Sequence, residues 1–161
     1  MTTELKTGEL KAGDRAPDFD MPGDTGPVSL AALKGKTVVL YFYPKDDTSG
    51  CTAEAQAFTA AAAAFAKAKA VVVGVSKDTV SKHAKFRAKY DLAPLLGSDE
   101  DGDVVERYGA WVEKSMYGRK YMGIDRSTFL IDGAGVVQRV WRKVKVPGHA
   151  VEVLAAAQAL R

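Results

Sequence analysis

The one cysteine of this chain is its most reactive side chain. Cys51 follows the polar stretch 46–50 and precedes an alanine-rich segment, so it falls in the first turn of a predicted helix. Unpaired backbone N–H groups and the positive end of the helix dipole meet there and favour the reactive thiolate. Unreactive buried cysteines usually lie within apolar runs, whereas the neighbours of Cys51 are small or polar. We therefore interpret Cys51 as a reactive thiol.

The residues around Cys51 exclude several designs of nucleophilic site. A phosphatase loop needs an arginine six residues after the cysteine, where this chain has Ala57. Thioredoxin-type exchange needs a second cysteine three residues on, where the chain has Glu54. A Cys–His hydrolase would need His83 or His149 as its base, and we expect both to lie on the surface. What remains is a thiolate that works without a base or a second thiol.

The composition is typical of an ordinary globular protein. The 161 residues are 47% hydrophobic and 27% charged with a net charge of +3, which predicts a single domain over 1–161 whose first residues, 1–12, are flexible. A single cysteine excludes an intrachain disulfide, and the residues indicate no metal site and no cofactor. Without an apolar span of about 20 residues or a signal peptide, we expect a cytoplasmic protein with no membrane partner. The basic segment 139–145 predicts a solvated strand face and no nucleic-acid partner.

Several elements must position the cysteine. Apolar runs without polar alternation predict buried strands at 37–43, 71–75 and 127–131, with a shorter one at 94–96. Hairpins are predicted over 16–30 and 127–143, and residues 111–125 have no clear period and predict an extended loop or bulge. Helices are predicted at 51–69, from a cap at Asp78 or Thr79 to Tyr90, and from Pro147 onward, and a short helix is predicted to end at Tyr108. In the helix that ends at Tyr90, the residues expected to face inward are Val80, Ala84 and Phe86.

This order of elements predicts an α/β protein with a thioredoxin-like fold. Its central mixed β-sheet is flanked by helices on both faces and carries an N-terminal β-hairpin extension. A flavodoxin-like sheet is the alternative, and the closing hairpin over 127–143 counts against it.

The segment before the cysteine resembles the active-site signature of a known family. Pro44-Lys45-Asp46-Asp47-Thr48-Ser49-Gly50-Cys51 fits Pro-x-x-x-Thr-x-x-Cys, which is similar to the signature of the peroxiredoxins. The longer run 41–52 resembles the branch called bacterioferritin comigratory protein or peroxiredoxin Q. Further similar strings lie at 16–19, 73–76 and 126–132, so the resemblance spans most of the chain.

The resemblance implies a thiol peroxidase. The Cys51 thiolate would attack the terminal oxygen of hydrogen peroxide or an organic hydroperoxide, leaving a sulfenic acid and releasing water or an alcohol. By the same resemblance, the Thr48 hydroxyl, the Cys51 backbone N–H and the Arg126 guanidinium stabilise the charge that develops on the leaving oxygen. Pro44 would shield the thiolate from water.

Two further residues are supporting candidates in this resemblance, and each candidate also has a purely structural interpretation. Gly50 belongs to the motif, and Glu54 lies one helical turn beyond the cysteine, where it could orient Arg126. Without the motif, Thr48 would be interpreted as a helix cap, Arg126 as a strand-edge residue and Glu54 as a solvated first-turn glutamate.

The chain departs from the family pattern at two places. Ser49 stands where many relatives have proline, which leaves the loop less rigid. Neither Gln56 nor the segment 81–87, where Q-type relatives carry a resolving cysteine, contains one. The resemblance therefore implies a one-cysteine mechanism with an external thiol reductant: thioredoxin, glutaredoxin with glutathione, or a small thiol. Since Q-type relatives are often monomers, we also expect a monomer.

Two other functions remain open from the sequence. A redox sensor or relay would use the same thiol chemistry once per partner and would turn over slowly with every reductant. A thioredoxin-fold binding module would show little peroxidase turnover, and its binding would survive Cys51→Ser. Three aromatic residues, Trp111, Tyr117 and Tyr121, are candidates either for lining the substrate entrance or for sealing the edge of the core.

The missing resolving thiol leads to a first prediction. A long-lived sulfenic acid at Cys51 is open to further oxidation. We expect excess peroxide to inactivate the unmodified protein faster than a Gln56→Cys variant that forms an internal disulfide, because the disulfide consumes the sulfenic acid first. Residual activity after graded peroxide exposure measures this. Equal inactivation, with the disulfide verified by mass, would contradict the expectation.

Overall fold

The computed structural model describes residues 10–160. The prediction of flexibility over 1–12 falls mostly on residues 1–9, outside the described residues. Among the described residues, no helix has the length and apolar character that crossing a bilayer requires.

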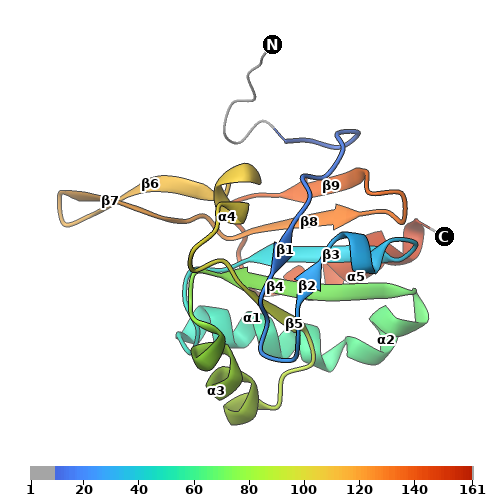
Figure 1. The fold of residues 1–161 in the computed structure, drawn as a ribbon, viewed down its shortest axis with the longest axis horizontal. Helices are drawn as coiled ribbons and strands as arrows, with labels where there is room; N and C mark the ends of the chain where they lie inside the picture. The colour runs from blue at the N-terminus through green and yellow to red at the C-terminus, as the bar shows by residue number, and fades with distance from the viewer. Residues whose placement is uncertain (1–9, 161) are drawn as a thin grey trace.

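A five-stranded mixed sheet forms the centre of the molecule (Figure 1). Its spatial order is β5-β4-β3-β8-β9, in which β3, β4 and β5 are parallel and β8 runs antiparallel to both β3 and β9. The antiparallel pair excludes the flavodoxin-like alternative, whose sheet is parallel. The strands span Thr37–Phe42 (β3), Ala70–Ser76 (β4), Leu95–Ser98 (β5), Ser127–Ile131 (β8) and Val137–Trp141 (β9).

Both faces of the sheet are covered, because alternate residues of β3 point into two separate apolar clusters. Val39 and Tyr41 pack with buried residues of α1, α2, α3 and α5, whereas Val38, Leu40 and Phe42 pack with α4 and the N-terminal hairpin. The predicted thioredoxin-like arrangement is thereby confirmed. The helices span Ser49–Ala60 (α1), Ala62–Lys67 (α2), Val80–Tyr90 (α3), Val104–Arg107 (α4) and His149–Ala159 (α5), with a short 3-10 helix at Ala31–Leu33 (η1).

The N-terminal hairpin and the cap of α3 are confirmed. Strands β1 (Asp20–Met21) and β2 (Val28–Ser29) pair antiparallel. The Thr79 side chain caps α3 by accepting a hydrogen bond from the Lys82 N–H. The predicted inward face of α3 is partly wrong, since Ala84 is exposed and His83 is buried beside Phe86.

The single helix predicted over 51–69 is wrong, because the chain turns at Ala61 and forms two helices. The backbone of Ala61 has φ −95° and ψ 7°, and its N–H bonds to carbonyls of the last turn of α1. The turn lets Phe58 of α1 and Phe65 of α2 approach to 5.9 Å between ring centroids. An alanine run carries no side chain that marks such a break, so the sequence gives no local signal for it.

The loop predicted over 111–125 is also wrong, because this segment is a β-hairpin that projects from the body (Figure 1). Strands β6 (Trp111–Met116) and β7 (Arg119–Ile124) pair antiparallel around Tyr117-Gly118. Both turn residues have positive φ, as a two-residue hairpin turn of type I′ requires. Most side chains of the hairpin are exposed on both faces, so the sequence shows no apolar alternation.

The three aromatic residues of this segment do not share one role. Trp111 packs against the apolar cluster of α4 and the N-terminal hairpin. Tyr117 is 95% exposed at the hairpin tip and Tyr121 is also exposed, so neither tyrosine seals the edge of the core.

One close contact fixes α1 on the sheet and generates a prediction. The Tyr41 ring stacks on Phe58 of α1 and lies over Gly74, where a Cβ atom would come within 2.7 Å of the ring. We expect Gly74→Ala to lower the free energy of unfolding by about 1–3 kcal/mol through overpacking. Urea unfolding measures the loss. In a Tyr41→Leu background the same substitution should cost less, and an equal cost would show that the tyrosine contact is not its cause.

Candidate active site

The fold buries Cys51 at the start of α1, behind the carboxyl end of β3. The cysteine is 1% exposed and lies in the first helical turn, after Thr48, whose extended backbone starts the helix. The first intrahelical bond from this end joins the Thr52 N–H to the Thr48 carbonyl over 2.8 Å. The N–H of Cys51 therefore precedes the intrahelical ladder and is one of the donors available to a bound group.

Arg126 lies against the thiol although 75 positions separate them in the sequence. Its Nη2 is 3.4 Å from Cys51 Sγ, and its Nη1 donates to Glu54 Oε1 over 2.6 Å. Burial lowers the pKa of Arg126, but the charge of Glu54 and the thiol outweigh burial, so its pKa is raised and the guanidinium stays charged. The structure thus brings together Cys51, Arg126 and Glu54.

The absence of a side chain at Gly50 leaves room for this guanidinium. A Cβ atom at Gly50 would lie 3.2 Å from Arg126 Nη2, closer than ordinary van der Waals contact. The glycine before the cysteine therefore lets Arg126 approach the first turn of α1.

Glu54 is a buried carboxyl group of which only one oxygen has a hydrogen-bond partner among the described residues. It is 1% exposed, and among the described residues its Oε2 has no hydrogen-bond partner. Burial raises the pKa of Glu54 to about 7, although Arg126 opposes this by favouring the charged form. The charge next to Arg126 therefore changes near neutral pH. The alternative that Glu54 is a solvated first-turn residue is wrong.

Thr48 and Pro44 lie in the exposed loop between β3 and α1. Thr48 occupies the N-cap position of α1, but its side chain makes no capping bond. Its hydroxyl donates instead to the Lys45 carbonyl over 2.9 Å, so the lone pairs of the hydroxyl oxygen face no donor of the helix. The capping role considered for the Thr48 side chain is therefore wrong.

Both histidines were predicted on the surface, and both are buried. His83 is 0% exposed and His149 is 5% exposed. His149 Nε2 lies 2.8 Å from Thr128 Oγ1 on β8, and the ring packs edge-on against Phe58 and Trp141. Burial lowers the pKa of His149, which favours its neutral form. The signal for His83 was its position three residues before Phe86, on the apolar face of α3.

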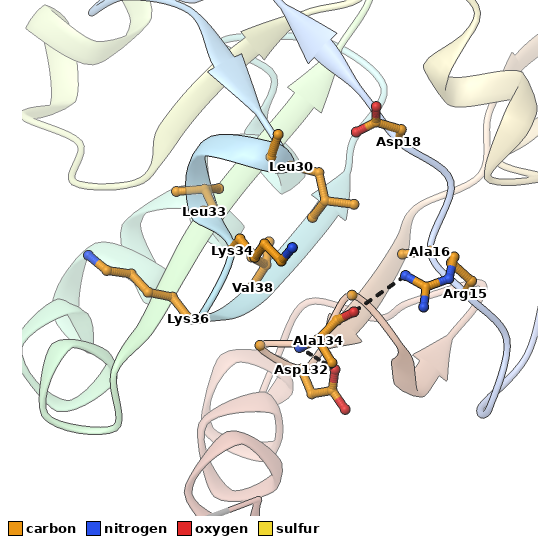
Figure 2. Close-up of a pocket in the computed structure, with 13 residues that line it drawn as sticks. Arg15, Ala16, Asp18, Leu30, Leu33, Lys34, Lys36, Val38, Asp132 and Ala134 are labelled. Carbon is orange, nitrogen blue, oxygen red and sulfur yellow. Dashed lines mark hydrogen bonds between the residues drawn. The ribbon is translucent and has the colours of Figure 1, made fainter.

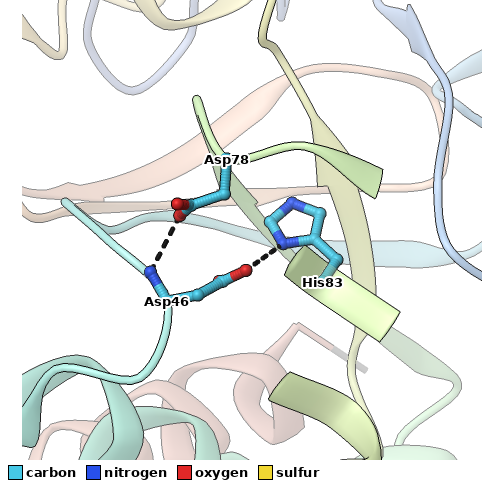
Figure 3. A group of neighbouring side chains, drawn as sticks. All are labelled: Asp46, Asp78 and His83. Carbon is cyan, nitrogen blue, oxygen red and sulfur yellow. Dashed lines mark hydrogen bonds and ion pairs between the residues drawn. The ribbon is translucent and has the colours of Figure 1, made fainter. Parts of the chain in front are cut away.

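His83 belongs to a cluster with two carboxylates that has the composition of a metal site (Figure 3). Asp46, Asp78 and His83 each have a potential ligand atom within 4.8 Å of the others. These atoms are already committed: Asp46 Oδ2 contacts His83 Nδ1 over 2.6 Å, and Asp78 Oδ2 accepts from the Asp46 N–H over 2.8 Å. The second His83 nitrogen lies 2.9 Å from the Gly97 carbonyl. The geometry therefore describes a closed hydrogen-bond network.

A separate hollow of about 260 Å³ lies at the opposite end of β3 (Figure 2). Its lining includes Leu33, Lys34 and Val38, and Arg15 at its rim donates to the Ala134 carbonyl. Cys51 follows the other end of β3, so this hollow contains none of the predicted site residues.

Comparisons with known proteins agree with this geometry. A family model described as the AhpC/TSA family matches residues 12–140. The peroxiredoxin Bcp of Bacillus subtilis is 47% identical over 146 residues, which cover 90% of this chain and 93% of the relative. The structure is similar to that of the bacterioferritin comigratory protein of Xanthomonas campestris, with a TM-score of 0.87, 43% identity and coverage of 92% and 98% of the two chains. A cysteine-to-serine variant of the Xylella fastidiosa peroxiredoxin Q aligns with a TM-score of 0.88, 36% identity and coverage of 95% and 98%.

The raised pKa of Glu54 predicts a pH-dependent stability. Between the ordinary glutamate pKa of 4.5 and about 7, the folded protein holds a proton that the unfolded chain has lost, so this contribution to stability is complete at low pH and declines as pH rises. We expect the free energy of unfolding of the unmodified protein, relative to Glu54→Gln, to fall by roughly 3 kcal/mol between about pH 4 and about pH 8. Urea unfolding across this range measures the difference. A constant difference would contradict the assignment.

Proposed function

The chain belongs to the AhpC/TSA family and is a thiol-dependent peroxiredoxin, and we propose that it reduces hydroperoxides through Cys51 alone, with an external thiol completing each cycle. The observation that carries this proposal is the 3.4 Å contact between Arg126 Nη2 and the sulfur of the chain's single cysteine.

The first half of the cycle forms a sulfur–oxygen bond and breaks the oxygen–oxygen bond of the peroxide. The Cys51 thiolate attacks the terminal oxygen, becomes a sulfenic acid, and releases water or an alcohol after one proton is taken up. Negative charge moves from sulfur to the leaving oxygen during this step. Fixed donors that contact both atoms lower the barrier because they need no rearrangement.

We expect two groups to supply such donors and a third to orient the peroxide. Arg126 keeps its charge at all working pH values and is oriented by Glu54 over 2.6 Å. The Cys51 N–H is one of the free donors of the first helical turn. The Thr48 hydroxyl donates its one proton to Lys45, so in this arrangement it does not donate to the leaving oxygen as the resemblance implied. Its oxygen would instead accept a hydrogen bond from the O–H of the peroxide and orient it. Pro44, in the same exposed loop, would limit the access of water to the thiolate.

A relative supports the proposed substrate class. The Xanthomonas campestris protein has been studied for alkyl peroxide reduction in trapped intermediate and ligand complexes. We extend this substrate class to the present chain, which would reduce both hydrogen peroxide and organic hydroperoxides.

The second half of the cycle needs thiols from outside the chain. The Xanthomonas relative has structures of two different cysteine-to-serine variants, whereas the present chain has one cysteine. A first external thiol would condense with the sulfenic acid to a mixed disulfide and water, and a second would release reduced Cys51. Thioredoxin, glutaredoxin with glutathione, or small thiols supply such electrons. Because such thiols are kept reduced in the cytoplasm, the proposal includes a cytoplasmic location.

The proposal predicts a large effect of removing the guanidinium. We expect Arg126→Ala to slow the formation of Cys51 sulfenic acid by roughly 100-fold, since one preorganised charged donor is lost. Brief hydrogen peroxide treatment, followed by a sulfenic-acid trap and intact-mass analysis, measures the rate. Arg119→Ala removes the same charge from the exposed hairpin and should react like the unmodified protein, and Cys51→Ser should not be labelled. Equal, slow labelling of the unmodified protein and Arg126→Ala would refute the proposed site.

A further inference from the structure

A buried histidine of α3 contacts Asp46 in the loop before the cysteine (Figure 3). At the surface, Lys89 and Tyr90 of α3 also bond to this loop, at Asp47. His83 projects from α3, is fully buried, and places Nδ1 2.6 Å from Asp46 Oδ2 and Nε2 2.9 Å from the Gly97 carbonyl of β5. Asp46 lies in the loop that carries Pro44 and Thr48 toward Cys51. The ring therefore bridges three separate segments of the chain.

The partners of the ring define its protonation. A carbonyl oxygen only accepts hydrogen bonds, so Nε2 must carry a proton. The other oxygen of Asp46, Oδ1, accepts from the Tyr43 hydroxyl over 2.6 Å, which leaves Oδ2 facing Nδ1. If Nδ1 carried no proton, its lone pair would face a carboxylate oxygen without a hydrogen bond between them. The contact is consistent with an imidazolium that donates from both nitrogens.

Asp46 is the point at which the loop is held most firmly. Besides its bonds to Tyr43 and His83, its backbone N–H donates to Asp78 Oδ2 over 2.8 Å, and the same oxygen accepts from the Ser76 hydroxyl over 2.6 Å. Thr48, only two residues farther along, is fixed by its own bond to Lys45. Release of Asp46 would free the segment that arranges Thr48 and Pro44 around the thiol.

We propose that His83 is a positioning residue for the peroxide reaction: its imidazolium holds Asp46, and through Asp46 the loop 44–48, in the conformation that receives the peroxide. This inference rests on the proposed function. His83 itself contacts neither the thiol nor the arginine and acts only through the loop.

The charge of His83 makes this support dependent on pH. Burial lowers the pKa of His83, but the hydrogen bond and charge of Asp46 outweigh it, with smaller support from the Gly97 carbonyl and Asp78, so the pKa is raised above 6.5. The Tyr43 ring is the third titratable neighbour, 6.4 Å away, and the lysines of α3 next to His83, Lys82 and Lys85, are exposed. The imidazolium of His83 therefore holds Asp46 fully at pH values below the ordinary histidine pKa, and this contact is lost as pH rises through the raised pKa of His83.

Asp46→Asn should reverse this dependence while keeping the shape of the side chain. The amide introduced at this position donates to Nδ1 of a neutral imidazole, and its oxygen still accepts from Tyr43. The network then survives at high pH and is lost when His83 is protonated. A role of Asp46 in folding alone would not change the direction of the pH dependence.

The experiment measures the second-order rate of Cys51 oxidation by hydrogen peroxide in stopped-flow at a series of pH values. In the unmodified protein we expect an alkaline decline that approaches tenfold per pH unit above the pKa of His83, about the slope with which the imidazolium is lost. Asp46→Asn should lack this decline. Asp47→Asn is the matched control, since it removes the same charge from the next residue, whose carboxylate pairs with Lys89 in an exposed contact, and it should retain the decline.

Two additions keep the test decisive. His83→Gln cannot titrate, so it also should lack the alkaline decline, and it replaces Asp46→Asn if that variant does not fold. The nitrogen chemical shifts of His83 should report an imidazolium at neutral pH in the unmodified protein and a neutral ring in Asp46→Asn. A neutral His83, no alkaline decline in the unmodified protein, or the same decline in all variants would overturn the positioning role. Failure of the proposed function would instead appear as no oxidation of Cys51 at any pH.

Discussion

The guanidinium of Arg126 is the interaction on which the rest of the site depends. It contacts the thiol with one nitrogen and the Glu54 carboxylate with another, so a single side chain joins the start of β8 to the first two turns of α1. The buried carboxylate of Glu54 is stabilised by the partly buried guanidinium of Arg126, and removing either partner leaves the other without its opposite charge. The arginine therefore stabilises a buried carboxyl group at the same place where we propose that it assists the thiol. The gap left by Gly50 is part of this constraint, since a side chain there would press on the guanidinium.

The loop before the cysteine is also held by contacts between buried polar groups. Asp46 and His83 are buried polar groups whose hydrogen bonds are complete, and such a network is rigid because every alternative leaves a buried group unsatisfied. Glu54 and His83 both have raised pKa values, but for different reasons: burial raises the pKa of Glu54, whereas at His83 burial lowers the pKa and the contacts with Asp46, Gly97 and Asp78 together outweigh it. The peroxidase site is thus flanked by two titratable groups, a carboxyl group with a pKa of about 7 and a histidine whose pKa is raised. A peroxiredoxin with one cysteine has no internal disulfide with which to rearrange, so the order of this loop in the reduced state is set by these contacts.

Many elements were predicted because their signals are local. Continuous β-branched and aromatic runs identified β3, β4 and β8, and the Thr79 cap identified the start of α3. The errors share a different cause. The break at Ala61 falls in an alanine run without a local stop signal, and the β6–β7 hairpin depends on cross-strand bonds within a segment whose side chains mostly face water. Neither feature is visible in the order of residues. His83 and His149 were misplaced because a histidine in a polar stretch resembles a surface residue until its partners are known.

The sequence by itself determined the lack of a second thiol and the motif that joins Pro44 and Thr48 to Cys51, and it predicted the nucleophile and its place at a helix start, because these depend on residue type and short spacing. It also indicated Arg126 as a candidate by resemblance. Only the tertiary structure decided that Arg126 lies 3.4 Å from the sulfur, that Glu54 is buried against it, and that the Thr48 hydroxyl bonds to Lys45 instead of capping the helix. The physical reason is that burial, charge pairing and hydrogen-bond partners are properties of groups distant in sequence, which exist only after the sheet has brought the ends of β3 and β8 together.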